Sequence, residues 1–118
     1  MNTICAWFDI PVSDMDRAVK FYEDVTGLTL KRAKIPGSKE TANFGTEGCL
    51  FKAPEDAPSH IGSRVYFSAA PSIEEWISRI EASGGKVLVP KTPIGEGMGQ
   101  YAYFEDSEGN RVGLHSKD

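Results

Sequence analysis

The stretch IPVSDMDRAVKFYEDVTGL, residues 10–28, predicts the end of a strand followed by a complete helix. Ser13 can cap the free backbone N–H groups at the helix start, and the acids beside it favour the positive end of the helix dipole. Gly27 ends the helix, because glycine readily adopts the left-handed conformation found there. The helix has one apolar stripe at three- and four-residue spacing, formed by Met15, Ala18, Val19, Tyr22 and Val25.

Strands are expected on both sides of this helix. Residues 4–12 alternate in polarity, with Cys5, Trp7 and Asp9 on one face, which is typical of a half-buried strand. The segments that follow the helix are predicted to be strands at residues 28–34, 41–44 and 48–52, with a turn at 35–38 and a linker at 53–59.

The second half of the chain repeats this order of elements. Its helix begins at Ser72, which lies 59 residues after Ser13, and ends at Gly85, which lies 58 residues after Gly27. The surrounding segments are predicted to be strands at 64–68, 86–90, 101–105 and 111–115, with a glycine-rich loop at 93–99. We therefore expect an α+β protein with two tandem βαβββ units, residues 1–58 and 59–118, in a single domain.

Composition limits the classes of function. The 118 residues are 40% hydrophobic and 25% charged, with a net charge of −4, which argues against a nucleic-acid-binding surface. No apolar run approaches the roughly 20 residues that span a membrane, and the first residues do not resemble a signal peptide. Cys5 and Cys49 do not form a disulfide framework, so we expect a reduced, cytoplasmic protein with no membrane partner.

Three stretches resemble the vicinal oxygen chelate superfamily: residues 10–28, residues 84–96 (GGKVLVPKTPIGE) and residues 106–115 (DSEGNRVGLH). This superfamily includes glyoxalase I, bleomycin- and fosfomycin-resistance proteins and extradiol dioxygenases. The chain looks most like its glyoxalase-related subgroup of undefined activity. The resemblance implies a curved mixed sheet around a cleft with the helices outside, a small-molecule ligand and a homodimer.

The resemblance also implies positions for a divalent metal, which His and Glu side chains of both units hold in metal-dependent members. The matching positions hold Trp7 and Gly113 and, if the second unit has one extra residue near Ala69, Arg64; without that residue the position is Val65. None of these side chains can ligate a metal. We therefore predict that the usual metal site is absent, and we predict no cofactor.

A displaced site is the alternative. His115 lies two residues beyond Gly113 on the same strand face, Asp9 lies two beyond Trp7, and Glu96 lies on the glycine-rich loop. These three residues could form a displaced metal site or a catalytic acid–base set. Equally, His115 could form a hydrogen bond to a neighbouring strand, and Asp9 could pair with Arg64.

Candidate ligand-binding residues surround the same cleft. Arg64 could bind an anionic group through its planar fork of donors, or form an internal salt bridge. Trp7 and Tyr66 could stack on a flat ligand, or pack as core aromatics. Tyr101 and Tyr103 share a strand face and could supply hydroxyls to the cleft, or lie at a dimer surface.

The function expected from these residues is that of a small-molecule-binding glyoxalase-like protein that lacks the usual metal ligands. It would be either a binding protein or a metal-independent enzyme for a small anionic or aromatic metabolite. One alternative is a metal-dependent glyoxalase-type lyase or isomerase with a displaced site. The other is a drug-sequestering resistance protein, which would need an acidic groove for a cationic drug, and Arg64 argues against that groove.

Overall fold

Each half of the chain forms the same five elements in the same order. The computed structural model describes residues 5–35, 39–53 and 57–117. The first half contains β1 (Phe8–Pro11), α1 (Met15–Thr26), β2 (Lys31–Ile35), β3 (Lys39–Phe44) and β4 (Gly48–Lys52). The second half contains β5 (Tyr66–Ser68), α2 (Ile73–Ala82), β6 (Lys86–Gly95), β7 (Gly99–Glu105) and β8 (Arg111–Ser116).

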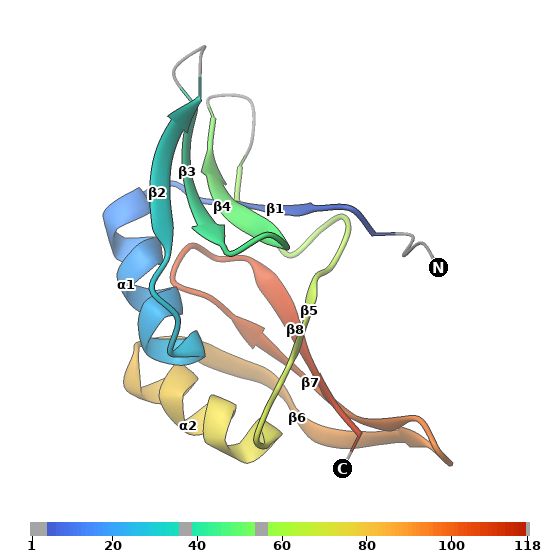
Figure 1. Cartoon of the computed structure of the whole chain (residues 1–118). Coiled ribbons are helices and arrows are strands. Elements are labelled where there is room, and N and C mark those ends of the chain that lie inside the picture. The colour runs from blue at the N-terminus through green and yellow to red at the C-terminus, as the bar shows by residue number, and fades with distance from the viewer. Residues whose placement is uncertain (1–4, 36–38, 54–56, 118) are drawn as a thin grey trace.

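The strands form two sheets with identical topology. Sheet A has the order β1-β4-β3-β2 and sheet B the order β5-β8-β7-β6. In sheet A, β1 is parallel to its neighbour β4, and in sheet B, β5 is parallel to its neighbour β8. All other neighbouring strands are antiparallel. Both helices lie on one side of the molecule and the two sheets on the other (Figure 1). The predicted α+β fold of two βαβββ units is confirmed, although the strands make two four-stranded sheets rather than one continuous sheet.

The helix ends follow the sequence pattern with two corrections. The second helix, α2, ends at Ala82 with Ser83 as its C-cap rather than at Gly85, and the glycine with a positive φ there is Gly84. The other correction concerns the start of α1. Asp14, not Ser13, caps α1, because its side chain accepts a hydrogen bond from the backbone N–H of Arg17. The Ser13 backbone N–H instead donates to Glu108, from the other end of the chain. Gly27 has a φ of 76° and ends α1 as expected.

The second helix also begins where the sequence predicts. Ser72 caps α2 by accepting a hydrogen bond from the backbone N–H of Glu75 at 3.1 Å. The Glu75 carboxylate does not reach back to the cap residue but accepts a hydrogen bond from Arg79 at 2.7 Å. Neither helix in the described part of the chain combines the length and apolar character that a membrane-crossing helix needs.

The prediction of a glycine-rich loop at residues 93–99 is wrong. Strand β6 continues to Gly95 and pairs with β7, which begins at Gly99, so this segment is the end of a hairpin. The pairing accommodates prolines by shifting register at three places along β6. The strand starts also differ: β1, β2 and β5 begin later than predicted, at Phe8, Lys31 and Tyr66. Of the predicted turn at 35–38, Ile35 ends β2 and residues 36–38 lie outside the described residues, as do residues 54–56 of the predicted linker.

The core lies between the helices and the inner faces of both sheets. Phe21 and Tyr22 of α1 contact each other edge to face, and Phe21 also contacts Phe104 of sheet B with ring centroids 6.3 Å apart. Trp76 of α2 packs on Phe67 of β5. One cluster of buried apolar residues therefore includes side chains from both halves of the chain.

The turn between β7 and β8 ties the two units together. The buried Tyr22 hydroxyl donates to Asp106 at 2.7 Å. Asn110 donates its side-chain amide to the Pro11 carbonyl at 2.7 Å. Glu108 accepts from two backbone N–H groups at the start of α1. The stretch DSEGN thus positions the second unit against the first strand and helix of the chain.

Candidate functional site

The face of sheet B that points away from the helices is aromatic and basic. Alternation along β7 and β8 places Ala102, Phe104, Val112 and Leu114 in the core, all at most 2% exposed. The strand register aligns Tyr66 with Gly113 and Tyr103, and it aligns Ser68 with His115 and Tyr101. These rows form one side of an open hollow of about 560 Å³, which is lined by Tyr66, Ser68, Ile94, Tyr101, Tyr103 and His115.

Gly113 leaves room for the ring of Tyr66. A Cβ atom built on Gly113 would collide with that ring. Tyr66 is 47% exposed, so its ring covers the glycine and still faces the hollow. A glutamate at position 113 could not coexist with Tyr66 in this position.

Tyr103 lies at the centre of the basic part of this face. The guanidinium carbon of Arg64 lies 4.7 Å from the centroid of the Tyr103 ring, and that of Arg111 lies 4.8 Å away. The hydroxyls of Tyr66 and Tyr103 share a short hydrogen bond. The Tyr101 ring lies 5.2 Å from the Tyr103 ring, centroid to centroid. Two positive charges and three aromatic rings therefore meet beside the hollow.

These contacts shift the ionisation of the two hydrogen-bonded phenols in opposite directions. The hydrogen bond from Tyr66 lowers the pKa of Tyr103 below its ordinary value, and Arg64 and Arg111 lower it further. Burial, together with the hydrogen bond to Tyr103, raises the pKa of Tyr66. Tyr66 is therefore the better donor of the pair and Tyr103 the better acceptor.

The two histidines both have partners. His115 Nε2 lies 3.0 Å from the Met98 carbonyl oxygen. This contact connects β8 to the end of the β6–β7 hairpin. The Nε2 atom of His60, in the segment before β5, lies 2.6 Å from the Glu105 carboxylate on β7. This contact holds the segment before β5 against the edge of the open face.

Asp9 lies on β1 of the other sheet, and Trp7 lies just before that strand. Trp7 is 43% exposed and donates its Nε1–H to Asp9 Oδ1 at 2.9 Å. The Cys49 thiol donates to the same oxygen at 3.2 Å. Burial, with the hydrogen bond to Asp9, raises the pKa of Cys49 to about 12. The suggested pairing of Asp9 with Arg64 is not seen, since Arg64 packs on Tyr103.

The three residues considered for acid–base or metal chemistry do not come together. Asp9 is on sheet A, His115 on sheet B and Glu96 is exposed at the hairpin end. Within residues 5–35, 39–53 and 57–117, no group of three His, Cys, Asp or Glu side chains could hold a metal ion. The side chains expected at the superfamily positions, those of Trp7, Gly113 and either Arg64 or Val65, would not ligate a divalent ion either.

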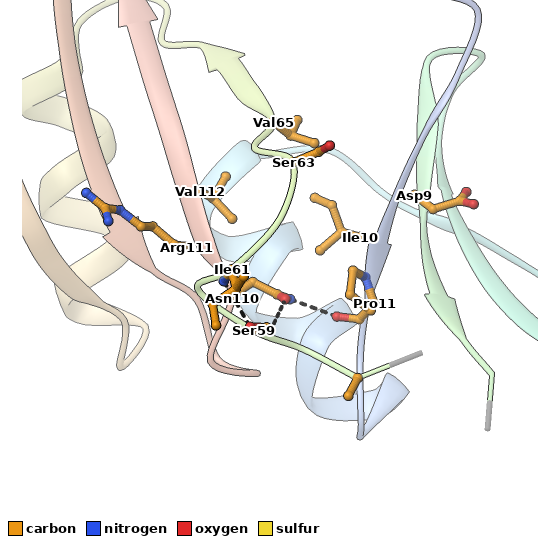
Figure 2. Close-up of a pocket in the computed structure, with 11 residues that line it drawn as sticks. Asp9, Ile10, Pro11, Ser59, Ile61, Ser63, Val65, Asn110, Arg111 and Val112 are labelled. Carbon is orange, nitrogen blue, oxygen red and sulfur yellow. Dashed lines mark hydrogen bonds between the residues drawn. The ribbon is translucent and has the colours of Figure 1, made fainter. Parts of the chain in front are cut away.

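A second pocket lies between the two units. Figure 2 shows it between β1, the segment before β5 and β8, where Asn110 contacts both Pro11 and Ser59. Its volume is about 80 Å³. Small-molecule sites usually measure roughly 300–1,000 Å³, so this pocket is too small for an aromatic ligand.

Two residues of the hollow, Ser68 and Ile94, and Arg111 beside it were not predicted from the sequence. Arg111 lies two residues before Gly113 on the same strand, so alternation alone could have placed it on the open face. Ser68 likewise lies two residues after Tyr66. Ile94 carries no such signal, because the register shifts along β6 decide where it points.

Comparisons with known proteins identify the family. A model described as the Glyoxalase/Bleomycin resistance protein/Dioxygenase superfamily matches residues 4–114. The chain therefore belongs to this superfamily, as its sequence motifs suggested.

Individual relatives agree with this assignment. The chain is 32% identical over 111 residues to a glyoxylase-like domain-containing protein of Didymella fabae, covering 86% of this chain and 84% of that protein. It is 30% identical over 112 residues to a lactoylglutathione lyase of Haemophilus influenzae, covering 86% and 83%. Other curated relatives are longer, and the chain spans 33–43% of their length. The fosfomycin resistance protein FosX of Listeria monocytogenes has the same fold, with a TM-score of 0.71 at 15% identity over 100% of this chain and 93% of that one.

Proposed function

We propose that this protein binds a small aromatic anion in the hollow on the open face of sheet B. The observation that carries this proposal is the placement of Arg64 and Arg111 within 4.8 Å of the Tyr103 ring, beside the hollow. Guanidinium groups recognise carboxylates and similar anions through paired donors, and the neighbouring rings offer stacking surfaces.

The size of the hollow, and an unsatisfied donor of Arg111 beside Tyr103, support this ligand class. Its volume of about 560 Å³ lies within the usual range for small-molecule sites. The Nε–H of Arg111 is buried and has no hydrogen-bond partner within the described residues. Because buried donors are usually satisfied, an anionic ligand that accepts from Arg111 would remove this deficit.

The proposed function does not use a metal. By the resemblance, Gly113 and either Arg64 or Val65 stand where metal-dependent members of the superfamily have ligands, and Tyr66 fills the space above Gly113. We therefore propose a binding protein or a metal-independent enzyme rather than a metal-dependent lyase. A glyoxalase-type lyase is the second candidate function, because one relative is a lactoylglutathione lyase.

Benzoate and benzylamine test the proposed charge preference, because they share one ring and carry opposite charges. A ligand that binds only the folded state raises the melting temperature. Benzoate is expected to raise the melting temperature in a concentration-dependent way, and benzylamine is expected to leave it unchanged. Equal shifts with both compounds would contradict the proposal, and a shift with benzylamine alone would instead favour the drug-sequestering alternative.

We also propose that the protein is a homodimer in which a second copy covers the open sheet faces. Large apolar side chains stand exposed near these faces, with Trp7 and Ile94 43% exposed and Met98 60% exposed. Burial of such side chains favours association. Sedimentation equilibrium is expected to give twice the monomer mass of 12.9 kDa, whereas a monomer at micromolar concentration would refute the proposal.

A further inference from the structure

Tyr103 differs chemically from the other three tyrosines of the chain. Its hydroxyl oxygen shares a short hydrogen bond with Tyr66, and its ring lies near two guanidinium groups. Tyr22 is the opposite case, because its hydroxyl is fully buried and donates to Asp106, which raises its pKa well above the ordinary value. A phenol that faces a ligand hollow and is surrounded by donors and positive charge is suited to carry a negative charge.

We propose that Tyr103 is the proton acceptor of this site, and that its ligand is a small aromatic compound whose acidic hydroxyl ionises on binding. This inference rests on the proposed function, since it concerns the same hollow. It narrows the ligand class from aromatic anions in general to phenols and enols. It also assigns separate roles to the neighbours, with Tyr66 as hydrogen-bond donor and Arg64 and Arg111 as counter-charges.

The proton transfer is balanced within the site. The O–H bond of the ligand breaks and its electron pair stays on the ligand oxygen. In molecules whose Tyr103 is in the tyrosinate form, the proton forms a new O–H bond on the Tyr103 oxygen. The negative charge moves from Tyr103 to the ligand but stays beside Arg64 and Arg111, so the transfer needs no oxidant, reductant or further reactant.

The groups that face Tyr103 from the neighbouring strands mostly favour its ionised form. Arg64 and Tyr66 approach from the β5 side, and Arg111 approaches from β8. Glu105, two residues along β7, is the opposing charge, but it is paired with His60 at 2.6 Å. The remaining titratable groups on this face are Tyr101, His115 and Lys86. The balance of charge around Tyr103 is therefore positive.

The ionisation of Tyr103 can be measured without any ligand, from the near-ultraviolet absorbance of tyrosinate during an alkaline titration. The wild-type protein is expected to show one tyrosine that ionises below the ordinary value of about 10. The early step should disappear in Tyr103→Phe, move to higher pH in Tyr66→Phe and persist in Tyr101→Phe. Circular dichroism and a cooperative thermal transition at neutral pH check that each variant is folded.

Two results of this titration would overturn the inference. One is that the early step survives in Tyr103→Phe. The other is that every tyrosine of the wild-type protein ionises at or above the ordinary value. Neither result depends on benzoate binding, so the inference and the proposed function can fail separately.

A coloured phenol then tests the proton transfer itself. 4-Nitrophenol is added at a pH where most of the free compound is neutral and colourless. Binding to the wild-type protein is expected to produce the yellow phenolate, and Tyr103→Phe is expected to produce much less of it. The inference is overturned if bound 4-nitrophenol stays colourless, or if it fails to bind while benzoate binds. If neither compound binds, the proposed function fails and this inference fails with it.

Discussion

Replacing Glu108 with alanine is expected to lower the free energy of unfolding by about 3 kcal/mol, because this side chain holds the start of α1. Its carboxylate accepts hydrogen bonds from the backbone N–H groups of Ser13 and Asp14, both at 2.8 Å, and from Arg17 at 2.6 Å. The Glu108 side chain is 0% exposed, so water does not replace these bonds when it is removed. Urea denaturation measures the change.

A matched control is Glu81→Ala, which removes an exposed glutamate from α2. That variant is expected to change the free energy of unfolding by no more than about 0.5 kcal/mol. Equal effects of the two substitutions would contradict the role given to Glu108. Since the Glu108 contact joins the two units, we also propose that the chain unfolds as one domain, in a single cooperative transition.

The effect of the Glu108 substitution should depend on pH. Burial would raise the pKa of Glu108, but hydrogen bonds from Arg17 and from the backbone N–H groups of Asp14 and Ser13 outweigh it and lower the pKa. A lowered pKa gives stability that is present above the ordinary value of 4.5 and is lost as the pH falls through the folded-state value. The difference between wild type and Glu108→Ala should therefore shrink in acid, whereas a constant difference would show that charge is unimportant.

Replacing Arg64 with methionine is expected to weaken benzoate binding by roughly tenfold or more, because a charged hydrogen-bond donor to the ligand is lost. Methionine keeps a flexible side chain of similar length beside Tyr103, so the substitution mainly removes the positive charge and the donors. Isothermal titration calorimetry on both proteins measures the change in dissociation constant.

Arg32→Met provides the control for this substitution. Arg32 lies on sheet A, away from the hollow, and pairs with Asp16 at 2.7 Å. Its replacement by methionine changes the net charge by the same amount as Arg64→Met. Benzoate affinity in Arg32→Met is expected to stay within about twofold of wild type. If both variants weaken binding equally, only the net charge matters, and Arg64 has no direct role.

Most of the fold could be predicted because the helices and strands follow from local sequence patterns. The stripe from Met15 to Val25 and the glycine that follows it are visible in a short stretch of sequence, and similar signals recur 58 or 59 residues later. The departures come from distant contacts. Ser13 was expected to cap α1, but Glu108 lies 95 residues away in sequence and takes its N–H group. Local patterns do not indicate such a partner.

The sequence predicts which side chains of a strand share a face of the sheet, but it does not predict which residues of neighbouring strands lie side by side in the candidate site. Two-residue spacing places Tyr101 with Tyr103, and Gly113 with His115, on one side of their strands. Which residue of β7 lies beside which residue of β8 depends on pairing that the spacing does not fix. The pairing of Tyr66 with Tyr103 and the approach of Arg111 to the same ring are therefore visible only in the structure.

The position of bound benzoate tests the central claim, that the open face of sheet B is the ligand site, most directly. Backbone amide chemical shifts of the isotopically labelled protein are recorded while benzoate is added. The account predicts that the largest changes fall on Tyr66, Tyr101, Tyr103 and His115. Largest changes on strands β1 to β4, or around the small pocket beside Asn110, would contradict it.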